Sequence, residues 1–215
     1  MKAAKIAFIA VSVLALASLA SAEEELPIPA DEFVYCTVCH GVQLMGNPIL
    51  KAPRLSGMEI WYVERQMLSF KKGLRGVHET DPAGMEMQPM AAALSNDQIT
   101  KVASYVAATR SDAPTRTVSG NVAAGRDHYA TCYACHGVKG EGNQATGGPA
   151  LAGLDDWYLV KQLKDYRDGR RGNNPDDMIG LQMRAATLIF LGDDEAINDV
   201  VSYITTLQDT GDSKL

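Results

Sequence analysis

The sequence predicts an all-α protein built from two similar domains in tandem. The first observation is an internal repeat. Cys36 and Cys132 are separated by 96 residues. When the 215-residue chain is compared with itself at this offset, the two halves align without a gap from these cysteines onward. The second is that apolar residues recur at steps of three and four, as on one face of a helix. The third is that the sequence lacks the alternating runs joined by tight turns that indicate strands.

Three helices are expected in each half, joined by long loops. Their ranges are 30–35 and 122–131, 58–70 and 155–166, and 96–108 and 193–207. Gly73 and Gly169 follow the second pair as stop signals. Ser95 is placed as an N-cap of the last helix in the first half.

The repeat also predicts the domain boundaries. We expect a first domain over residues 23–109 and a second over 121–215. The intervening residues 110–120 are rich in Ser, Thr and Asp around Pro114 and have no apolar periodicity, which is typical of a linker. Domains of this size bury little apolar surface alone, so a bound apolar group would help to complete each core.

Each half carries the motif Cys-x-x-Cys-His, the attachment signature of c-type haem. The two thiols become thioethers to the haem, and the histidine faces the iron as an axial ligand. The residues are Cys36, Cys39 and His40 in the first half and Cys132, Cys135 and His136 in the second. A zinc site or a redox dithiol would not explain the histidine that follows each pair. All four cysteines are used, so two covalently bound haem c groups, each containing iron, are expected.

The second axial ligand of each iron is expected to be a methionine. The spare histidines, His78 and His128, have no histidine at the matching position of the other half. Among the methionines only Met87 and Met183 coincide in the repeat. A thioether ligand favours ferrous iron and so raises the reduction potential. Because both axial positions would then be filled, electron transfer is expected rather than oxygen or peroxide chemistry. In the first half Met85 and Met90 remain alternatives.

The N-terminus has the features of a secretory signal peptide over residues 1–22. Lys2 and Lys5 precede an apolar stretch, and Ala20-Ser21-Ala22 is a small-residue cleavage site. The mature chain would begin near Glu23. An uncleaved membrane anchor is the alternative, so peripheral association with a membrane stays open.

The chain is acidic, with a formal net charge of −6 that becomes −8 when the two lysines of the signal are removed. This charge argues against nucleic acid as a partner. It suits a redox partner with a basic docking patch, although solubility alone would also account for it.

Over residues 24–209 the chain resembles the two-domain, dihaem class I cytochromes c of bacteria, the cytochrome c-four type. The resemblance rests on the attachment motif, a Pro-x-Leu-x-Gly segment, a Tyr/Gln helix, a methionine loop and a C-terminal helix in each half. It implies two tandem class I cytochrome c domains exported to the periplasm. It also implies that the carbonyls of Pro53 and Pro149 accept a hydrogen bond from the haem-ligating histidines.

The resemblance assigns further residues to packing and to the haem surroundings. Tyr105 and Tyr203 are expected to pack on the first helix of their halves, near Phe33 and Tyr129. The expected haem walls and propionate partners are Trp61, Tyr62, Gln66 and Arg75 with Trp157, Tyr158, Gln162 and Arg171. Plain core packing for the aromatics and solvated charges for the arginines are the alternatives.

Three functions are compatible with these features. The favoured one is a soluble electron carrier, not an enzyme, that links a quinol-oxidising complex or a dehydrogenase to a terminal oxidase. The second is a dedicated cytochrome subunit of a periplasmic dehydrogenase, which would expose an apolar patch to its partner. The third is a redox enzyme, which would need an open iron position. The sequence leaves the partners, the potentials and the oligomeric state open.

Overall fold

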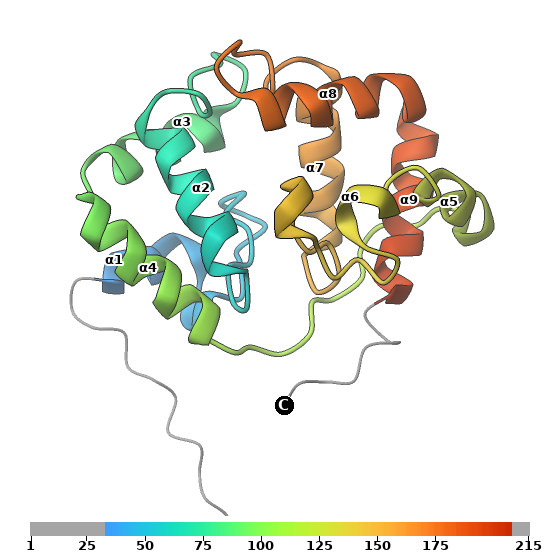
Figure 1. Ribbon diagram of the computed structural model, residues 1–215. Helices are drawn as coiled ribbons and strands as arrows, with labels where there is room; N and C mark the ends of the chain where they lie inside the picture. The colour runs from blue at the N-terminus through green and yellow to red at the C-terminus, as the bar shows by residue number, and fades with distance from the viewer. Residues whose placement is uncertain (1–32, 208–215) are drawn as a thin grey trace, which may run out of the picture.

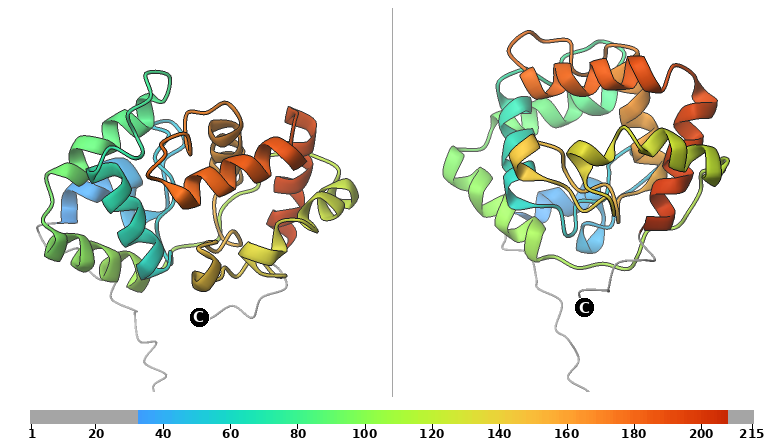
Figure 2. Two further views of the ribbon diagram at one scale, coloured as in Figure 1. Left: turned by 45° about the horizontal axis from the view of Figure 1, so that its top comes forward. Right: turned by 45° about the vertical axis from the view of Figure 1, so that its right-hand side comes forward.

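The computed structural model describes residues 33–207, and it shows two helical halves side by side (Figure 1 and the left-hand view of Figure 2). The first half contains α1 (Val34–His40), a short 3-10 helix (Val42–Leu44), α2 (Ile60–Lys71), α3 (Pro82–Ala92) and α4 (Asn96–Ala108). The second contains α5 (Val122–Tyr129), α6 (Tyr133–His136), a 3-10 helix (Gln144–Thr146), α7 (Asp156–Arg167), α8 (Met178–Phe190) and α9 (Asp194–Leu207). The all-α prediction is confirmed.

The N-terminal signal expected over residues 1–22 lies outside the described residues, as does part of the helix expected over 30–35. Within residues 33–207 no helix is both long enough and apolar enough to cross a membrane.

Five of the six expected helices are found with ends within two residues of those expected. The helix expected over 30–35 overlaps α1 only at its last two residues, because α1 begins at Val34 and continues through the Cys-x-x-Cys-His motif to His40.

A further correction concerns the methionine segments. The segments that carry Met87 and Met183, which we expected to be loops, form α3 and α8. The side chain of Asp81 caps α3 by accepting a hydrogen bond from the Gly84 N–H at 3.2 Å, and proline follows it at the start of the helix. Asp177 caps α8 in the same way. Asp81 and Asp177 align in the repeat, and an aspartate is a common residue at a helix N-cap.

The core of each half forms where its helices meet. Phe33 stacks on Tyr105 with ring centroids 5.6 Å apart, and Tyr129 packs on Tyr203 at 5.4 Å, as the resemblance implied. Apolar side chains of α2 and α4 fill the first core, and those of α7 and α9 fill the second. These contacts fix the helices on which the functional side chains lie.

The segment between α4 and α5 runs along one edge of the molecule and links the halves (Figure 1). It is anchored by Asp156, whose side chain is only 1% exposed and accepts hydrogen bonds from Thr117 and Val118. The linker is therefore tied to the second half at the first residue of α7.

Candidate functional site

The histidine of each Cys-x-x-Cys-His motif lies at the end of a helix and points inward. His40 is 8% exposed and His136 is 7% exposed. The Nδ1 atom of His40 lies 2.7 Å from the Pro53 carbonyl oxygen, and that of His136 lies 2.8 Å from the oxygen of Pro149. Because a carbonyl only accepts, Nδ1 carries the proton and Nε2 is left free to bind a metal. Burial lowers the pKa of both imidazoles, although the same hydrogen bonds oppose this shift.

The loop after each histidine brings the proline back to it. The N–H of Gly46 donates to the His40 carbonyl at 2.8 Å, and a one-residue bridge pairs Asn47 with Ala52. In the second half Gly142 donates to His136 at the same distance, and Asn143 pairs with Gly148. The two histidine–proline loops thus have one conformation, which explains why the repeat aligns them without a gap.

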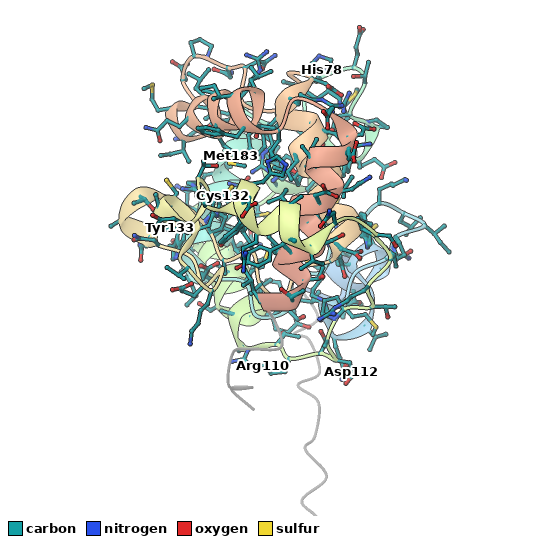
Figure 3. All side chains as sticks on the ribbon, turned by 90° about the vertical axis from the view of Figure 1, so that its right-hand side faces the viewer. His78, Arg110, Asp112, Cys132, Tyr133 and Met183 are labelled. Atoms are coloured by element: carbon teal, nitrogen blue, oxygen red, sulfur yellow. The ribbon has the colours of Figure 1, made fainter. Side chains whose placement is uncertain are left out.

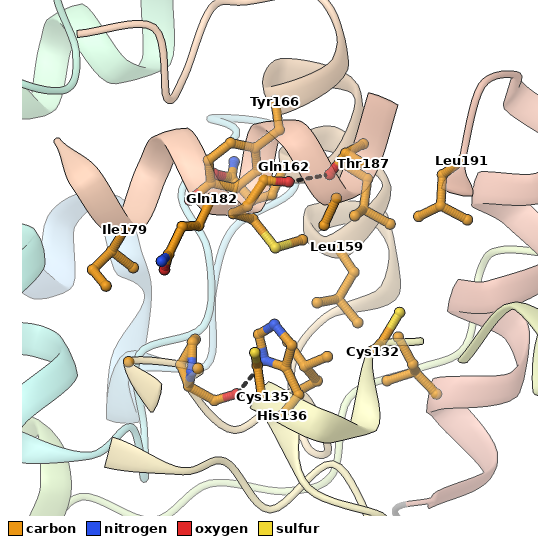
Figure 4. Close-up of a pocket in the computed structure, with 18 of the residues that line it drawn as sticks. Cys132, Cys135, His136, Leu159, Gln162, Tyr166, Ile179, Gln182, Thr187 and Leu191 are labelled. Atoms are coloured by element: carbon orange, nitrogen blue, oxygen red, sulfur yellow. Dashed lines mark hydrogen bonds between the residues drawn. The ribbon is translucent and has the colours of Figure 1, made fainter. Parts of the chain in front are cut away.

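A cavity lies beside His136 in the second half. In Figure 4, His136 and Cys135 lie on one side of it, and Gln182 and Thr187 of α8 lie on the other. The right-hand view of Figure 2 shows the same arrangement, with α8 across the top and α6 below it. Apolar side chains form much of the wall, among them Leu151, Leu154, Leu159, Leu163, Ile179 and Val200. Such a cavity suits a large, flat, mostly apolar ligand.

The cysteines and the methionine of the second half reach this cavity. Cys132, Cys135 and Met183 all line it. In Figure 3, the label of Met183 lies next to α8, and the label of Cys132 lies below that of Met183. All four cysteines have free thiols in the structure, so each is available for a thioether bond.

The three candidate methionines of the first half differ in how deeply they are buried. Met87 is partly buried and packs against the hydrophobic core. Met85 is 46% exposed and Met90 is 51% exposed, so neither packs inward as Met87 does. Met87 therefore occupies the position that corresponds to Met183 in both the repeat and the fold.

Two arginines meet two glutamines between the halves. Gln66 accepts from Arg75 of its own half and from Arg171 of the other half, each at 2.8 Å. Gln162 accepts from Arg171 at 2.5 Å and from Arg75 at 2.9 Å. The residues expected as separate haem surroundings are thus brought into one cluster across the interface.

This cluster leaves cationic groups without an anion. Among residues 33–207 no carboxylate lies within ion-pair distance of Arg75 or Arg171, and Nε of Arg75 is buried without a hydrogen-bond partner. Buried cations are normally paired, so an anionic group of a ligand fits here. With the apolar cavity, the free Nε2 and the thiols, the residues fit haem and its propionates.

Arg65 is a residue of this site that sequence reasoning did not find. It projects from α2 of the first half, lines the cavity of the second half and donates to the Gly147 carbonyl at 2.8 Å. The repeat places Lys161 at the matching position, where it binds Asp81 of the first half at 2.8 Å. Each half therefore has a cation at this position that contacts the other half. In the sequence, only the positive charge shared by Arg65 and Lys161 could have indicated these contacts.

Comparisons with known proteins agree with this geometry. A family model described as Cytochrome c matches residues 33–110 and again residues 122–208. A thiosulfate dehydrogenase electron acceptor of Stutzerimonas stutzeri is 34% identical over 184 residues, covering 80% of this chain and 78% of that protein. A cytochrome c4 of Pseudomonas aeruginosa is 31% identical over 206 residues, covering 90% and 94%.

A solved structure shows the same architecture. The crystal structure of reduced recombinant cytochrome c4 from Pseudomonas stutzeri superimposes with a TM-score of 0.63 and 28% sequence identity. The match covers 80% of this chain and 93% of that one. The chain belongs to the cytochrome c family, in its two-domain dihaem cytochrome c4 group, and is an electron-transfer cytochrome with two covalently bound haem c groups.

Proposed function

We propose that the protein is a periplasmic carrier that moves single electrons between a respiratory donor and a terminal oxidase or another acceptor. The family supports redox proteins as its partners in general. Export through the signal expected at residues 1–22 supports the compartment. We also propose the boundaries 23–109 and 121–215 for the two domains, with residues 110–120 as their linker.

The observation that carries this proposal is the buried histidine whose Nδ1 is fixed by a proline carbonyl in each half, facing an apolar cavity in the second. We assign His40 and Met87 as the axial ligands of one iron and His136 and Met183 as those of the other. Cys36, Cys39, Cys132 and Cys135 would hold the haems covalently, and these haems supply reversible one-electron chemistry when bound.

The protein's own residues set the conditions for that chemistry. The carbonyls of Pro53 and Pro149 fix the tautomer and orientation of the two imidazoles. The apolar wall of the second-half cavity would limit the access of water to the iron, and Arg75 and Arg171 would offer positive charge to the propionates. A methionine in each remaining axial position would keep small molecules from the iron, which favours electron transfer over substrate turnover.

A spectroelectrochemical titration of the purified protein tests the proposal. We expect two one-electron steps per chain and no turnover of peroxide or thiosulfate by the protein alone. Catalytic turnover without a partner, or rapid binding of carbon monoxide by either ferrous haem, would contradict an electron carrier in which protein ligands fill both axial positions of each iron.

A second candidate is an electron-accepting subunit fixed to a periplasmic dehydrogenase. The relative named as a thiosulfate dehydrogenase electron acceptor favours it. Exposed apolar residues near the two haem sites, such as Val38 at 68% and Ile189 at 72%, offer contact area for either kind of partner. Size-exclusion chromatography of the native protein separates the two candidates, because a fixed subunit elutes with its dehydrogenase at high ionic strength and a carrier elutes alone.

A further inference from the structure

The peptide group that follows Pro53 is hydrogen-bonded at both ends. Its carbonyl oxygen accepts from Nδ1 of His40 at 2.7 Å. Its N–H, which belongs to Arg54, donates to Oδ2 of Asp155 at 2.9 Å. Asp155 lies at the start of α7, in the other half of the molecule. A carboxylate of the second half is therefore connected through one peptide group to the haem-ligating histidine of the first half.

The second half repeats this arrangement in the opposite direction. The Pro149 carbonyl accepts from His136 at 2.8 Å, and the N–H of the same peptide group, that of Ala150, donates to Oε1 of Glu59 at 3.0 Å. Glu59 lies at the start of α2 in the first half, and the repeat aligns it with Asp155. The connection is reciprocal, since each half supplies a carboxylate to the histidine of the other.

A glycine in each half leaves room for the carboxylate. A Cβ atom on Gly46 would lie 2.7 Å from the Arg54 nitrogen and 2.8 Å from Oδ2 of Asp155. A Cβ atom on Gly142 would lie 2.5 Å from the Ala150 nitrogen and 2.6 Å from Oε1 of Glu59. Both glycines also have positive φ, +90° and +82°. A side chain at either position would separate the carboxylate from the peptide group.

Hydrogen bonds in a chain polarise one another, more strongly where water is excluded. A carboxylate at the N–H end increases the negative charge on the carbonyl oxygen of the same peptide group. The oxygen then accepts more strongly from Nδ1–H, which makes the imidazole a stronger donor to a metal. A more strongly donating ligand stabilises ferric iron and lowers the reduction potential.

We propose that Glu59 and Asp155 tune the reduction potentials across the interface, each acting through a proline peptide group on the haem held by the other half. The proposal rests on the assignment of His40 and His136 as axial ligands. Both carboxylates are positioning residues, because they act through the peptide group and the imidazole. The packing of the halves would then couple the potential of each haem to the opposite domain.

The two connections differ in their surroundings. Asp155 is 8% exposed, and Nε of Arg54 lies 3.7 Å from its Oδ1, so an amide at this position would leave a buried cation behind. Glu59 is partly exposed and accepts a hydrogen bond from the N–H of Ala150. Among residues 33–207 no cation lies within ion-pair distance of it. Glu59→Gln is therefore the cleaner perturbation, because it removes the charge and keeps an oxygen acceptor.

The test is a redox titration of wild type, Glu59→Gln and Asp155→Asn followed by NMR of protein labelled with ¹⁵N-histidine. The chain has only four histidines, so the signals of His40 and His136 can be assigned and each potential tracked separately. We expect Glu59→Gln to raise the potential of the His136 centre and Asp155→Asn to raise that of the His40 centre. The expected size is up to about tenfold in the equilibrium constant for reduction, which is about 59 mV for one electron. The Nδ1–H signal of the same histidine should move toward that of a weaker hydrogen bond.

Glu64→Gln is the matched control, because Glu64 lies on α2, the helix whose N-cap is Glu59, and undergoes the same change of charge. Glu64 accepts a hydrogen bond from Thr100 instead of from a proline peptide group. Gly142→Ala is a second variant, since it separates Glu59 from the peptide group without removing the charge, and it should also raise the potential of the His136 centre. Three results would overturn the proposal: unchanged potentials, a shift confined to the haem of the mutated half, or an equal shift in Glu64→Gln. Wild-type protein without His/Met spectral features would instead contradict the ligand assignment.

Discussion

Replacing Asp156 should strongly destabilise the second half, because its buried carboxylate accepts several hydrogen bonds. The side chain is 1% exposed and accepts from Thr117 Oγ1 at 2.7 Å, from Val118 N–H at 2.7 Å and from the N–H groups of Thr117 and Trp157. Alanine leaves the Thr117 and Val118 N–H groups without an acceptor, at a cost of about 1–3 kcal/mol each. We therefore expect Asp156→Ala to lower the free energy of unfolding by about 4 kcal/mol.

Asp156→Asn removes the negative charge but keeps a side chain of nearly the same shape, so it tests the contribution of the charge. Asp156→Asn keeps one acceptor oxygen and should cost about 2 kcal/mol, because hydrogen bonds to charged groups are stronger than neutral ones. Denaturant unfolding followed by far-UV circular dichroism and haem absorbance measures both values. A loss below about 1 kcal/mol for Asp156→Ala would contradict this prediction, because it would mean that water replaces the carboxylate without penalty.

The same carboxylate predicts a pH dependence. Burial alone would raise the pKa of Asp156, but the hydrogen bonds from Thr117 and Val118 hold the pKa below its usual value. A lowered pKa in the folded state contributes stability that is present above the unfolded-state pKa of about 3.9 and is lost as the pH falls through the folded-state value. Asp156→Asn should therefore reduce the loss of stability measured between neutral pH and acid.

Two further predictions concern Met87, the axial ligand that we propose for the first haem, and the loop between α7 and α8. Met87→His should lower the potential of one haem and halve the charge-transfer band of ferric His/Met haem, whereas Met85→Leu should change neither in optical redox titrations; the reverse pattern would assign Met85 as the ligand. Gly172→Ala should lower the free energy of unfolding by at least about 2 kcal/mol, because φ is +70° and the new Cβ would lie 2.2 Å from the Gly180 oxygen. Gly153→Ala should cost only about 1 kcal/mol in the same assay, because φ is +86° but, apart from the chain neighbours, no heavy atom of the described residues lies within 4 Å of the new Cβ. Equal losses in the two variants would contradict a steric clash at Gly172.

The sequence predicted the parts of the structure that depend on local signals and on the repeat. The cysteine motifs and the helix stops at Gly73 and Gly169 follow from short segments that each half contains in full. The Pro53 and Pro149 contacts were implied by the family resemblance alone, and both are present in the structure. The helical form of the Met87 segment was missed because its apolar periodicity is weak, although Asp81 followed by proline marks its start.

Contacts between the halves could not be predicted in this way. A repeat shows that two domains are alike, but it does not show which surfaces meet. The hydrogen bond from Ala150 to Glu59 joins residues 91 positions apart, and that from Arg54 to Asp155 joins residues 101 positions apart. Neither carboxylate has a motif around it, and only the packed structure shows that both contact a histidine–proline loop of the other half.

The decisive measurement is the optical spectrum of the purified protein, oxidised and reduced, with haem measured per chain. We predict two haems per chain, a charge-transfer band of His/Met ligation in the ferric form, and no spectral change when peroxide or carbon monoxide is added. Absence of the band, or ready binding of carbon monoxide at one haem, would contradict two closed His/Met centres and would favour a redox enzyme.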